Sequence, residues 1–245
     1  SIRLVGSEMC IRDRPLPDIV TPTYELVIPS SKKKLKYRPF LVKEQKVLIL
    51  ALEENDSVQI LEAIKTIFKS CIITRFKMDD LSIFDVEYIF LQLRGRSIQE
   101  TIDVEVPCDD DEDVKVPVSF PVDAVKVNFP EGHESTIKLT EDIVVQMKYP
   151  NLDYFAKVNF TEEETDPYEL VSSCIDRVYN KGEDCGSFTA EEAHRWLETL
   201  TNDQFESIQN FFDTMPTLRH ELTVTNPNTG TKTTAVIEGL VNFFG

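Results

Sequence analysis

Two short segments near the start of the chain alternate between apolar and polar positions. Residues 24–28 (YELVI) and 35–40 (LKYRPF) show this alternation, and the residues between them, 29–33 (PSSKK), favour a turn. A period of two is typical of a half-buried strand, so the pattern predicts a β-hairpin. Pro39 cannot donate a ladder hydrogen bond, and we therefore expect it at a strand end or on an edge strand.

Between residues 42 and 93 the period lengthens to that of helices. An apolar helix is predicted over residues 42–52, and the acidic segment 53–56 ends it. Asp56 or Ser57 can cap a second helix. The apolar residues of that helix follow the spacing of one buried face: Val58, Ile60, Leu61, Ile64, Ile67 and Phe68. A third helix follows residues 78–80 and is apolar nearly all round, which predicts a central place in the helical layer.

After Gly95 the period returns to two. Alternating segments occupy residues 101–106, 114–120, 124–129, 136–139 and 143–148, and Tyr149 followed by Pro150 ends the series. The pattern predicts one antiparallel sheet of short strands with a solvated face.

A second helical block is predicted over residues 167–214, interrupted by a loop at 180–187. Thr189 and Glu192 have the spacing of a capping box at the start of a helix that carries Trp196. Residues 222–224 and 235–237 flank the turn sequence 226–230 (NPNTG), which predicts a closing hairpin. The expected fold class is α+β: an N-terminal hairpin and three-helix block, a central antiparallel sheet, a second helical block and a C-terminal hairpin.

The first residues of the chain follow no helical or strand period. Residues 1–14 (SIRLVGSEMCIRDR) lack the apolar stretch of a secretory signal and resemble a translated sequencing adapter, so we expect a non-native leader. No flexible linker interrupts residues 15–245, for which we expect one two-lobed domain. Within it, residues 15–96 supply the hairpin and helices, 97–150 the sheet, and 151–245 the second helical block and closing hairpin.

Composition narrows the classes of partner. The chain has 26 Lys and Arg against 43 Asp and Glu, a formal net charge of −17. Such a chain repels phosphate, which argues against nucleic acid or an anionic membrane as the main partner. Five cysteines without a C-x-x-C pair indicate reduced thiols rather than a disulfide framework. No apolar run has the length of a membrane span, and 245 residues can bury a core that needs no metal.

Candidate chemistry is sparse. The acidic run 109–113 fails the EF-hand template, because Val114 stands where the turn glycine belongs and Phe120 where the bidentate glutamate belongs. The cysteines and histidines are scattered, and the chain has no G-x-S-x-G elbow, P-loop or dinucleotide fingerprint. We therefore expect no catalytic residue, no cofactor and no metal. A hydrolase that uses Cys185, with His194 nearby in sequence, or a carboxylate pair stays open as an alternative of another class.

One basic stretch departs from the acidic background. Lysines at 32–34, 36, 43 and 46 surround Arg38, interleaved with aromatic residues. This stretch is either a solvated strand face or a docking patch for an acidic neighbour. For the docking patch we expect Arg38 as the exposed anchor and Phe40 inside the fold. The residues of this candidate interface are Tyr37, Arg38, Phe40 and Lys43, with Phe243 and Phe244 at the C-terminus as a second docking candidate.

The same region carries a resemblance to a known family. Residues 36–46 (KYRPFLVKEQK), running into 48–53 (LILALE), resemble the opening of the small baseplate hub family of T4-like contractile-tailed phages. Residues 84–94 (FDVEYIFLQLR) are similar to that family's central helix, and residues 149–150 and 239–244 stand where the family has comparable segments. The resemblance covers residues 15–245 and is most specific in the first hundred.

The resemblance implies a non-enzymatic hub subunit or hub-assembly factor of the phage tail baseplate, with a dissociable assembly chaperone for hub proteins as the alternative. It implies other baseplate hub or tail proteins as partners, leaves a homo-oligomer open, and places the chain in the virion after assembly in the host cytoplasm. Some members carry cysteine pairs in two hairpins that suggest zinc knuckles. Here Cys108 stands alone and the 226–230 turn has no cysteine, so no metal is expected.

Overall fold

The structure is a computed structural model that describes residues 20–54, 56–98, 101–108, 111–152, 154 and 166–239. The expected leader, Asp109 and Asp110 of the acidic run, and Phe243 and Phe244 lie outside these residues. Helices and antiparallel strands are both present throughout the described chain, so the α+β class is confirmed.

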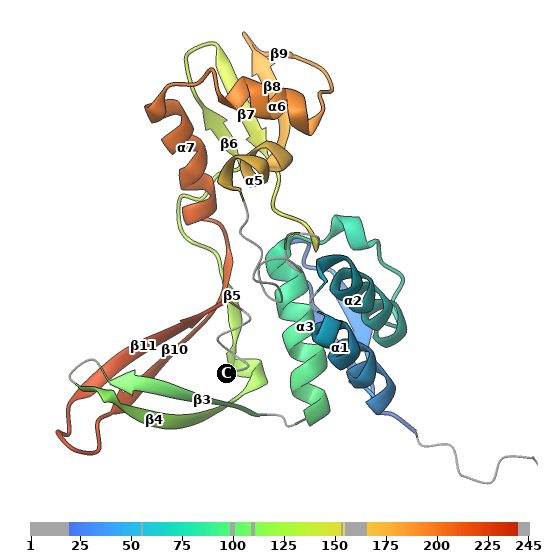
Figure 1. Cartoon of the computed structure of the whole chain (residues 1–245), viewed down its shortest axis with the longest axis vertical. Helices are drawn as coiled ribbons and strands as arrows, with labels where there is room; N and C mark the ends of the chain where they lie inside the picture. The colour runs from blue at the N-terminus through green and yellow to red at the C-terminus, as the bar shows by residue number, and fades with distance from the viewer. Residues whose placement is uncertain are drawn as a thin grey trace, which may run out of the picture.

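The N-terminal block consists of one hairpin and three helices (Figure 1). Its elements are β1 (Tyr24–Val27), β2 (Lys34–Tyr37), α1 (Val42–Glu54), α2 (Ser57–Cys71) and α3 (Ile83–Ile98), with a short 3-10 turn, η1 (Met78–Asp80), before α3. The strands pair in antiparallel register from Tyr24 with Tyr37 to Val27 with Lys34. The predicted hairpin and helices are therefore confirmed.

Helix α3 is the centre of this block. Its side chains are buried on nearly every side: Phe84, Val86, Ile89, Phe90, Leu91 and Leu93 are all within the core. In α2 the expected buried face is correct for Ile60, Ile64, Ile67 and Phe68 but wrong for Val58, which is exposed. At 100° per residue Val58 points about 160° away from Ile60, so it faces solvent.

Two β-hairpins form an arm beside α3. One consists of β3 (Thr101–Cys108) and β4 (Asp111–Pro121), and the other of β10 (Thr217–Thr225) and β11 (Lys232–Glu238). Figure 1 shows both hairpins on the side of α3 away from α1 and α2. Residues Ile102 and Val104 of one hairpin and Val224 and Ile237 of the other belong to the same apolar cluster as α3. The arm is therefore continuous with the N-terminal core.

A second lobe lies at the other end of the molecule (Figure 1) and has its own core. Its sheet has the order β6-β7-β8-β9, formed by β6 (Thr136–Lys138), β7 (Ile143–Met147), β8 (Ile175–Asn180) and β9 (Glu183–Asp184). Its helices are α5 (Pro167–Cys174), α6 (Ala190–Leu197) and α7 (Asn202–Asp213). Capping boxes open α6 at Thr189 and α7 at Thr201, the first of which the sequence predicted.

The grouping of strands differs from the expected central sheet. The segments of residues 97–150 are divided among three sheets, because β5 (Lys126–Asn128) pairs with β10 and β7 pairs with β8. The strand β8 was expected as helix, and the 180–187 segment that follows it contains the short strand β9. Alternation predicts a strand but does not specify its neighbour, which is chosen by packing between segments far apart in sequence.

A stack of aromatic rings joins the two lobes. Tyr149 packs against both apolar clusters, and its ring centroid lies 5.4 Å from that of Phe211. The His133 imidazole lies between the Tyr149 hydroxyl, 2.9 Å from Nε2, and Thr214 Oγ1, 3.0 Å from Nδ1. The first cluster contains residues on both sides of position 96 and also Leu218. The expectation of one two-lobed domain over residues 15–245 stays a prediction.

Candidate functional site

The junction between β2 and α1 carries the residues predicted for partner binding. Tyr37 and Phe40 are buried within the N-terminal core. The Tyr37 ring packs against Tyr24 with 5.8 Å between centroids, and the Phe40 ring meets Phe90 edge-on at the same separation. The Phe40 N–H donates to Ser97 Oγ at 2.5 Å. Both aromatic side chains therefore hold the junction onto the helices instead of facing a partner.

Arg38 is bound to groups from two helices. Its guanidinium donates from Nη2 to Glu44 Oε1 at 2.8 Å and from Nη1 to Glu44 Oε2 at 3.3 Å. Nη1 also donates to the Pro39 carbonyl oxygen at 3.0 Å and lies 3.6 Å from Cys71 Sγ. Because Arg38 is 15 % exposed and Glu44 is 5 % exposed, this is a bidentate ion pair that is largely shielded from water.

Glu44 is the centre of this network. Besides Arg38, it accepts hydrogen bonds from the Leu41 N–H at 2.9 Å and from Ser70 Oγ at 3.1 Å. Burial alone would raise the pKa of Glu44, but the hydrogen bonds from Arg38 and Leu41 and the charge of Arg38 lower it to about 2. The same pair raises the pKa of Arg38, and burial raises the pKa of the Cys71 thiol. The network is therefore charged at neutral pH and ties β2, α1 and α2 together.

The expectation that Arg38 is an exposed anchor is wrong. A charge pattern cannot distinguish an arginine that faces water from one that meets a buried carboxylate. The burial of Glu44 depends in turn on residues distant in sequence, such as Ser70, which donates to it. Of the four predicted interface residues at this junction, Lys43 has the exposed side chain. Phe243 and Phe244 lie outside the described residues, so the second docking candidate stays a prediction.

Exposed lysines remain on the adjacent hairpin. Lys32, Lys33, Lys34 and Lys36 are all exposed, and we call this group the lysine hairpin. Its turn is fixed to the start of α3, because the buried Asp85 carboxylate accepts from Ser30 N at 2.9 Å and from Ser30 Oγ at 2.5 Å. Lys32 Nζ lies 4.7 Å from the centroid of the Phe129 ring. The lysine hairpin is therefore a held surface rather than a free loop.

Helix α1 presents an outward apolar surface that the hydrophobic pattern did not predict. Val42 is 82 % exposed, Leu50 50 % and Ile49 47 %, whereas Leu48 and Ala51 face the core. The sequence contained a signal for this surface. Apolar residues occupy both faces of the helix, and a helix packed on one side can bury only one of its faces.

The alternative reading as a hydrolase finds no support at Cys185. Cys185 lines an apolar pocket with Phe188 and Trp196, whereas His194 lines another with Tyr168. Within the described residues no hydrogen bond joins Cys185 to His194, and the His194 Nε2 lies 3.9 Å from Glu198 Oε1 instead. A nucleophile and its base need that contact.

Three described carboxyls have environments that can be compared with that of a catalytic carboxylate pair. Two carboxyls that share a proton raise the pKa of one of them. The carboxyls of Glu44, Asp184 and Glu192 all have a lowered pKa. For Asp184 and Glu192 the first cause is a hydrogen bond from a backbone N–H. These groups are stabilised carboxylates rather than general acids.

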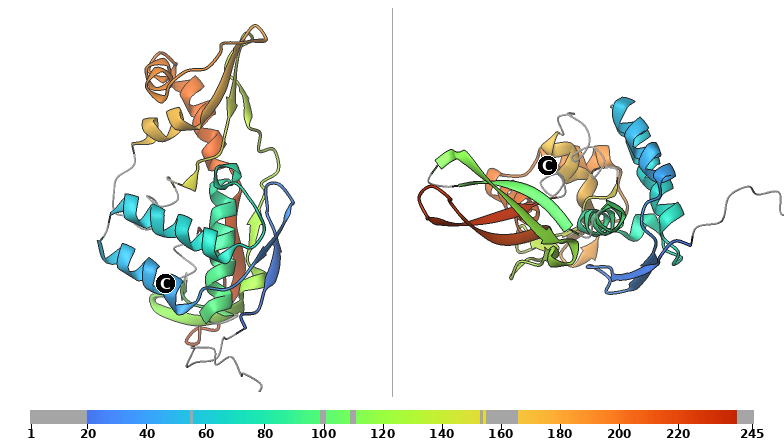
Figure 2. Two further views of the ribbon diagram at one scale, coloured as in Figure 1. Left: turned by 90° about the vertical axis from the view of Figure 1, so that its right-hand side faces the viewer. Right: turned by 90° about the horizontal axis from the view of Figure 1, so that it is seen from below.

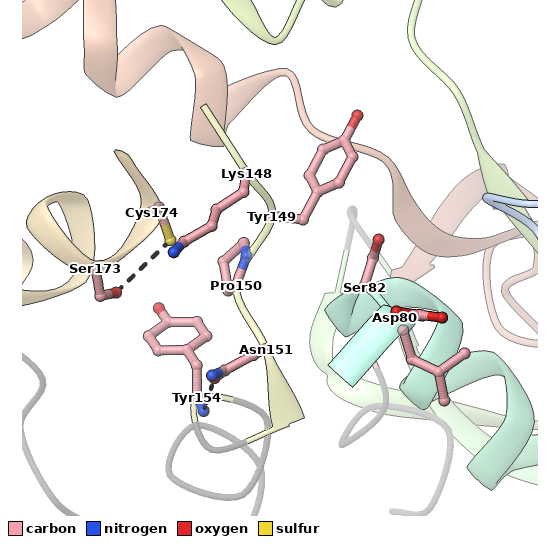
Figure 3. Close-up of a pocket in the computed structure, with 10 residues that line it drawn as sticks. Asp80, Ser82, Lys148, Tyr149, Pro150, Asn151, Tyr154, Ser173 and Cys174 are labelled. Atoms are coloured by element: carbon pink, nitrogen blue, oxygen red, sulfur yellow. Dashed lines mark hydrogen bonds between the residues drawn. The ribbon is translucent and has the colours of Figure 1, made fainter. Parts of the chain in front are cut away.

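A cavity of about 450 Å³ lies between the two lobes (Figure 3). Lys148, Tyr154 and Cys174 line one side of it, and Asp80 and Ser82 line the other. Burial raises the pKa of the Cys174 thiol to about 11, so the sulfur is protonated at neutral pH and is a poor nucleophile.

Nowhere in the described residues do three or more His, Cys, Asp or Glu side chains gather closely enough to hold a metal ion. Among the helices that the structure describes, none has both the length and the apolar character that crossing a membrane requires.

A family model described as "T4 bacteriophage base plate protein" matches residues 21–245, which is most of the chain. No curated protein and no solved structure matches the chain. The match supports a structural role in the phage tail with contacts to other tail proteins, while the narrower hub assignment stays a prediction. The chain therefore belongs to the T4 bacteriophage base plate protein family.

Proposed function

We propose that this protein is a baseplate hub subunit that acts through protein–protein contacts and has no catalytic step. Family membership supports a place in the tail, and the resemblance of residues 36–53 and 84–94 supports the hub. The proposal also places the chain in the host cytoplasm during assembly and in the virion afterwards.

The observation that carries this proposal is the lysine hairpin on an acidic chain. Residues 20–98 contain 13 Lys and Arg against 10 Asp and Glu, whereas residues 99–245 contain 10 against 30. The bases thus gather in the N-terminal block, where Lys32, Lys33, Lys34 and Lys36 are exposed together. Charge of one sign on a rigid surface steers a partner of the opposite sign and fixes its orientation.

We infer that the partner is an acidic surface of another hub protein. The lysine hairpin and the exposed Lys43 supply the contact, and the buried Arg38, Tyr37 and Phe40 hold the strand and helix that present it. Phe243 and Phe244 form the second proposed contact. Lysine side chains keep their aliphatic stems against the protein, so such a surface can pack as well as attract.

Mass spectrometry of purified particles tests the proposal against the assembly chaperone. A hub subunit is retained in the virion, whereas a dissociable chaperone is found in the infected-cell lysate and is lost from the particle. Absence of the chain from intact particles would exclude a hub subunit and favour the chaperone.

A charge-reversed variant tests the docking surface. We expect Lys33→Glu/Lys34→Glu to reduce co-purification with other hub proteins at least about 10-fold, because like charges across an interface repel. The matched control is Lys138→Glu/Lys181→Glu, which reverses two exposed lysines of the second lobe. Equal recovery of hub proteins with both variants would place the contact elsewhere.

A further inference from the structure

The outward face of α1 is apolar and lies at the outer side of the N-terminal block. Val42, Ile49 and Leu50 are exposed there, while Glu44 and Leu48 on the opposite face are buried. Figure 2 shows α1 on the side of the molecule away from the two-hairpin arm. Large apolar side chains gathered on one helix face are typical of a surface that another protein covers.

The charges of this face follow an unusual order along the helix. Lys43 and Lys46 lie in the first turns, whereas Glu53 and Glu54 end the helix, and its last turn has no basic residue. A helix favours acidic residues at its N-terminus and basic residues at its C-terminus, so these four residues oppose the helix dipole. All four are exposed. This order of charges therefore does not stabilise the isolated helix. It favours a partner whose charges run in the opposite order along the contact.

An antiparallel copy of the same helix is complementary to this order. The outward positions Val42, Lys46, Ile49 and Glu53 follow the spacing of four, three and four residues that a helix–helix seam requires. Lys46 and Glu53 lie about 5 Å on either side of the point midway between residues 49 and 50, given the 1.5 Å rise per residue. A twofold axis through that point brings each lysine opposite a glutamate of the other helix.

We propose that two copies of this chain associate through α1 in an antiparallel, twofold-symmetric arrangement. Ile49 packs against Leu50 of the second copy, and Lys46 pairs with Glu53 of the second copy. Every contact occurs twice, as in an isologous interface.

The size of the surface sets the expected strength of the dimer. Helix α1 has 13 residues and is therefore about 20 Å long. A stable interface buries about 800 Å² on each partner, which is more than a single helix of this length supplies. We therefore expect a dimer that dissociates in the range of about 10 to 100 µM rather than an obligate one.

Sedimentation equilibrium of the purified full-length chain over a concentration series tests the proposal. We expect the wild-type chain to dimerise and Lys46→Glu to weaken the association at least about 10-fold, because the variant sets like charges opposite each other twice. Glu53→Lys has the same effect. The double variant Lys46→Glu/Glu53→Lys exchanges the two charges, and we expect it to restore association to within about threefold of the wild type.

Val236→Asp is the matched control, because Val236 is an exposed apolar residue of the arm. It leaves the association unchanged, whereas Ile49→Asp abolishes it. The proposal is overturned if the wild-type chain is monomeric up to about 1 mM, as when the terminal residues of the same chain cover α1. It is also overturned if the charge exchange fails to restore a dimer that the single variants lose. The measurement needs no other tail protein, so its result is separate from that of the hub assignment.

Discussion

Removal of the Arg38 guanidinium should destabilise the N-terminal block strongly while leaving its surface nearly unchanged. Arg38→Met keeps the aliphatic stem of the side chain but removes both hydrogen bonds to Glu44. The Glu44 carboxylate, 5 % exposed, then retains the Leu41 N–H and Ser70 Oγ as donors and the exposed Lys43 Nζ at 3.5 Å. A shielded carboxylate that has lost its bidentate partner disfavours the folded state.

The loss of the ion pair sets the size of the effect. Removing one partner of a buried ion pair costs about 3 to 5 kcal/mol. The lowered pKa of Glu44 has the same sign, and Arg38 contributes to it together with the hydrogen bonds from Leu41 and Ser70. We therefore expect Arg38→Met to lower the free energy of unfolding by about 3 kcal/mol at pH 7.

Urea-induced unfolding, followed by far-UV circular dichroism, measures this loss. The matched control is Lys36→Met, which removes a cation from the neighbouring exposed ion pair with Glu25. Both partners of that pair are more than half exposed, so its loss costs less than about 1 kcal/mol. The double variant Arg38→Met/Glu44→Leu should recover most of the stability, because a well-packed apolar pair can replace a buried ion pair. Equal stabilities of Arg38→Met and Lys36→Met would refute the reasoning.

Three further outcomes follow from the structure. Because the pKa of Glu44 is lowered in the folded state, the ionised carboxylate stabilises the fold fully above pH 4.5, and this stabilisation is lost as the pH falls toward 2. The difference in unfolding free energy between wild type and Glu44→Gln, measured by urea denaturation at a series of pH values, should therefore shrink by about 3 kcal/mol over this range. A constant difference would contradict this. Alanine favours a helix more than glycine does, yet Gly95→Ala should lower the free energy of unfolding by about 1 to 3 kcal/mol, because the added Cβ would lie 2.3 Å from Val122 Cγ2. The double variant Gly95→Ala/Val122→Ala should recover part of this loss. Thr201→Ala removes the acceptor of the Gln204 N–H at the start of α7 and should lower the free energy of unfolding by about 1 kcal/mol. Urea unfolding followed by the fluorescence of Trp196, which packs in the same lobe, measures this loss, and an unchanged urea midpoint would show that the cap is dispensable.

Local chemistry explains which elements could be predicted. The first hairpin, the three helices of the N-terminal block, the α6 capping box and the closing hairpin follow from periodicity, caps and turn residues within a few positions of one another. The central place of α3 follows in the same way, because a helix that is apolar nearly all round must be covered on most sides. These features need no knowledge of distant partners.

Partners distant in sequence decided the remaining features. The strand β5 pairs with β10 some 90 residues later, and β8 is a strand because β7 offers it an open edge. The alternation of a short segment does not specify which strand it pairs with, so one sheet was expected where three are formed. Which strands form the arm and which form the second lobe is therefore known only from the tertiary structure.

The same reason applies to the candidate interface. The composition of residues 32–46 by itself determined a basic stretch in an acidic chain. Tertiary structure decided which of those charges face water: Arg38 meets Glu44, to which Ser70 also donates, while the lysine hairpin stays exposed. Tertiary structure also decided that one apolar face of α1 is exposed to solvent. A helix buries only the face that packs against its neighbours, however hydrophobic its other face is. Sequence determines which side chains must be satisfied, and packing determines which groups satisfy them.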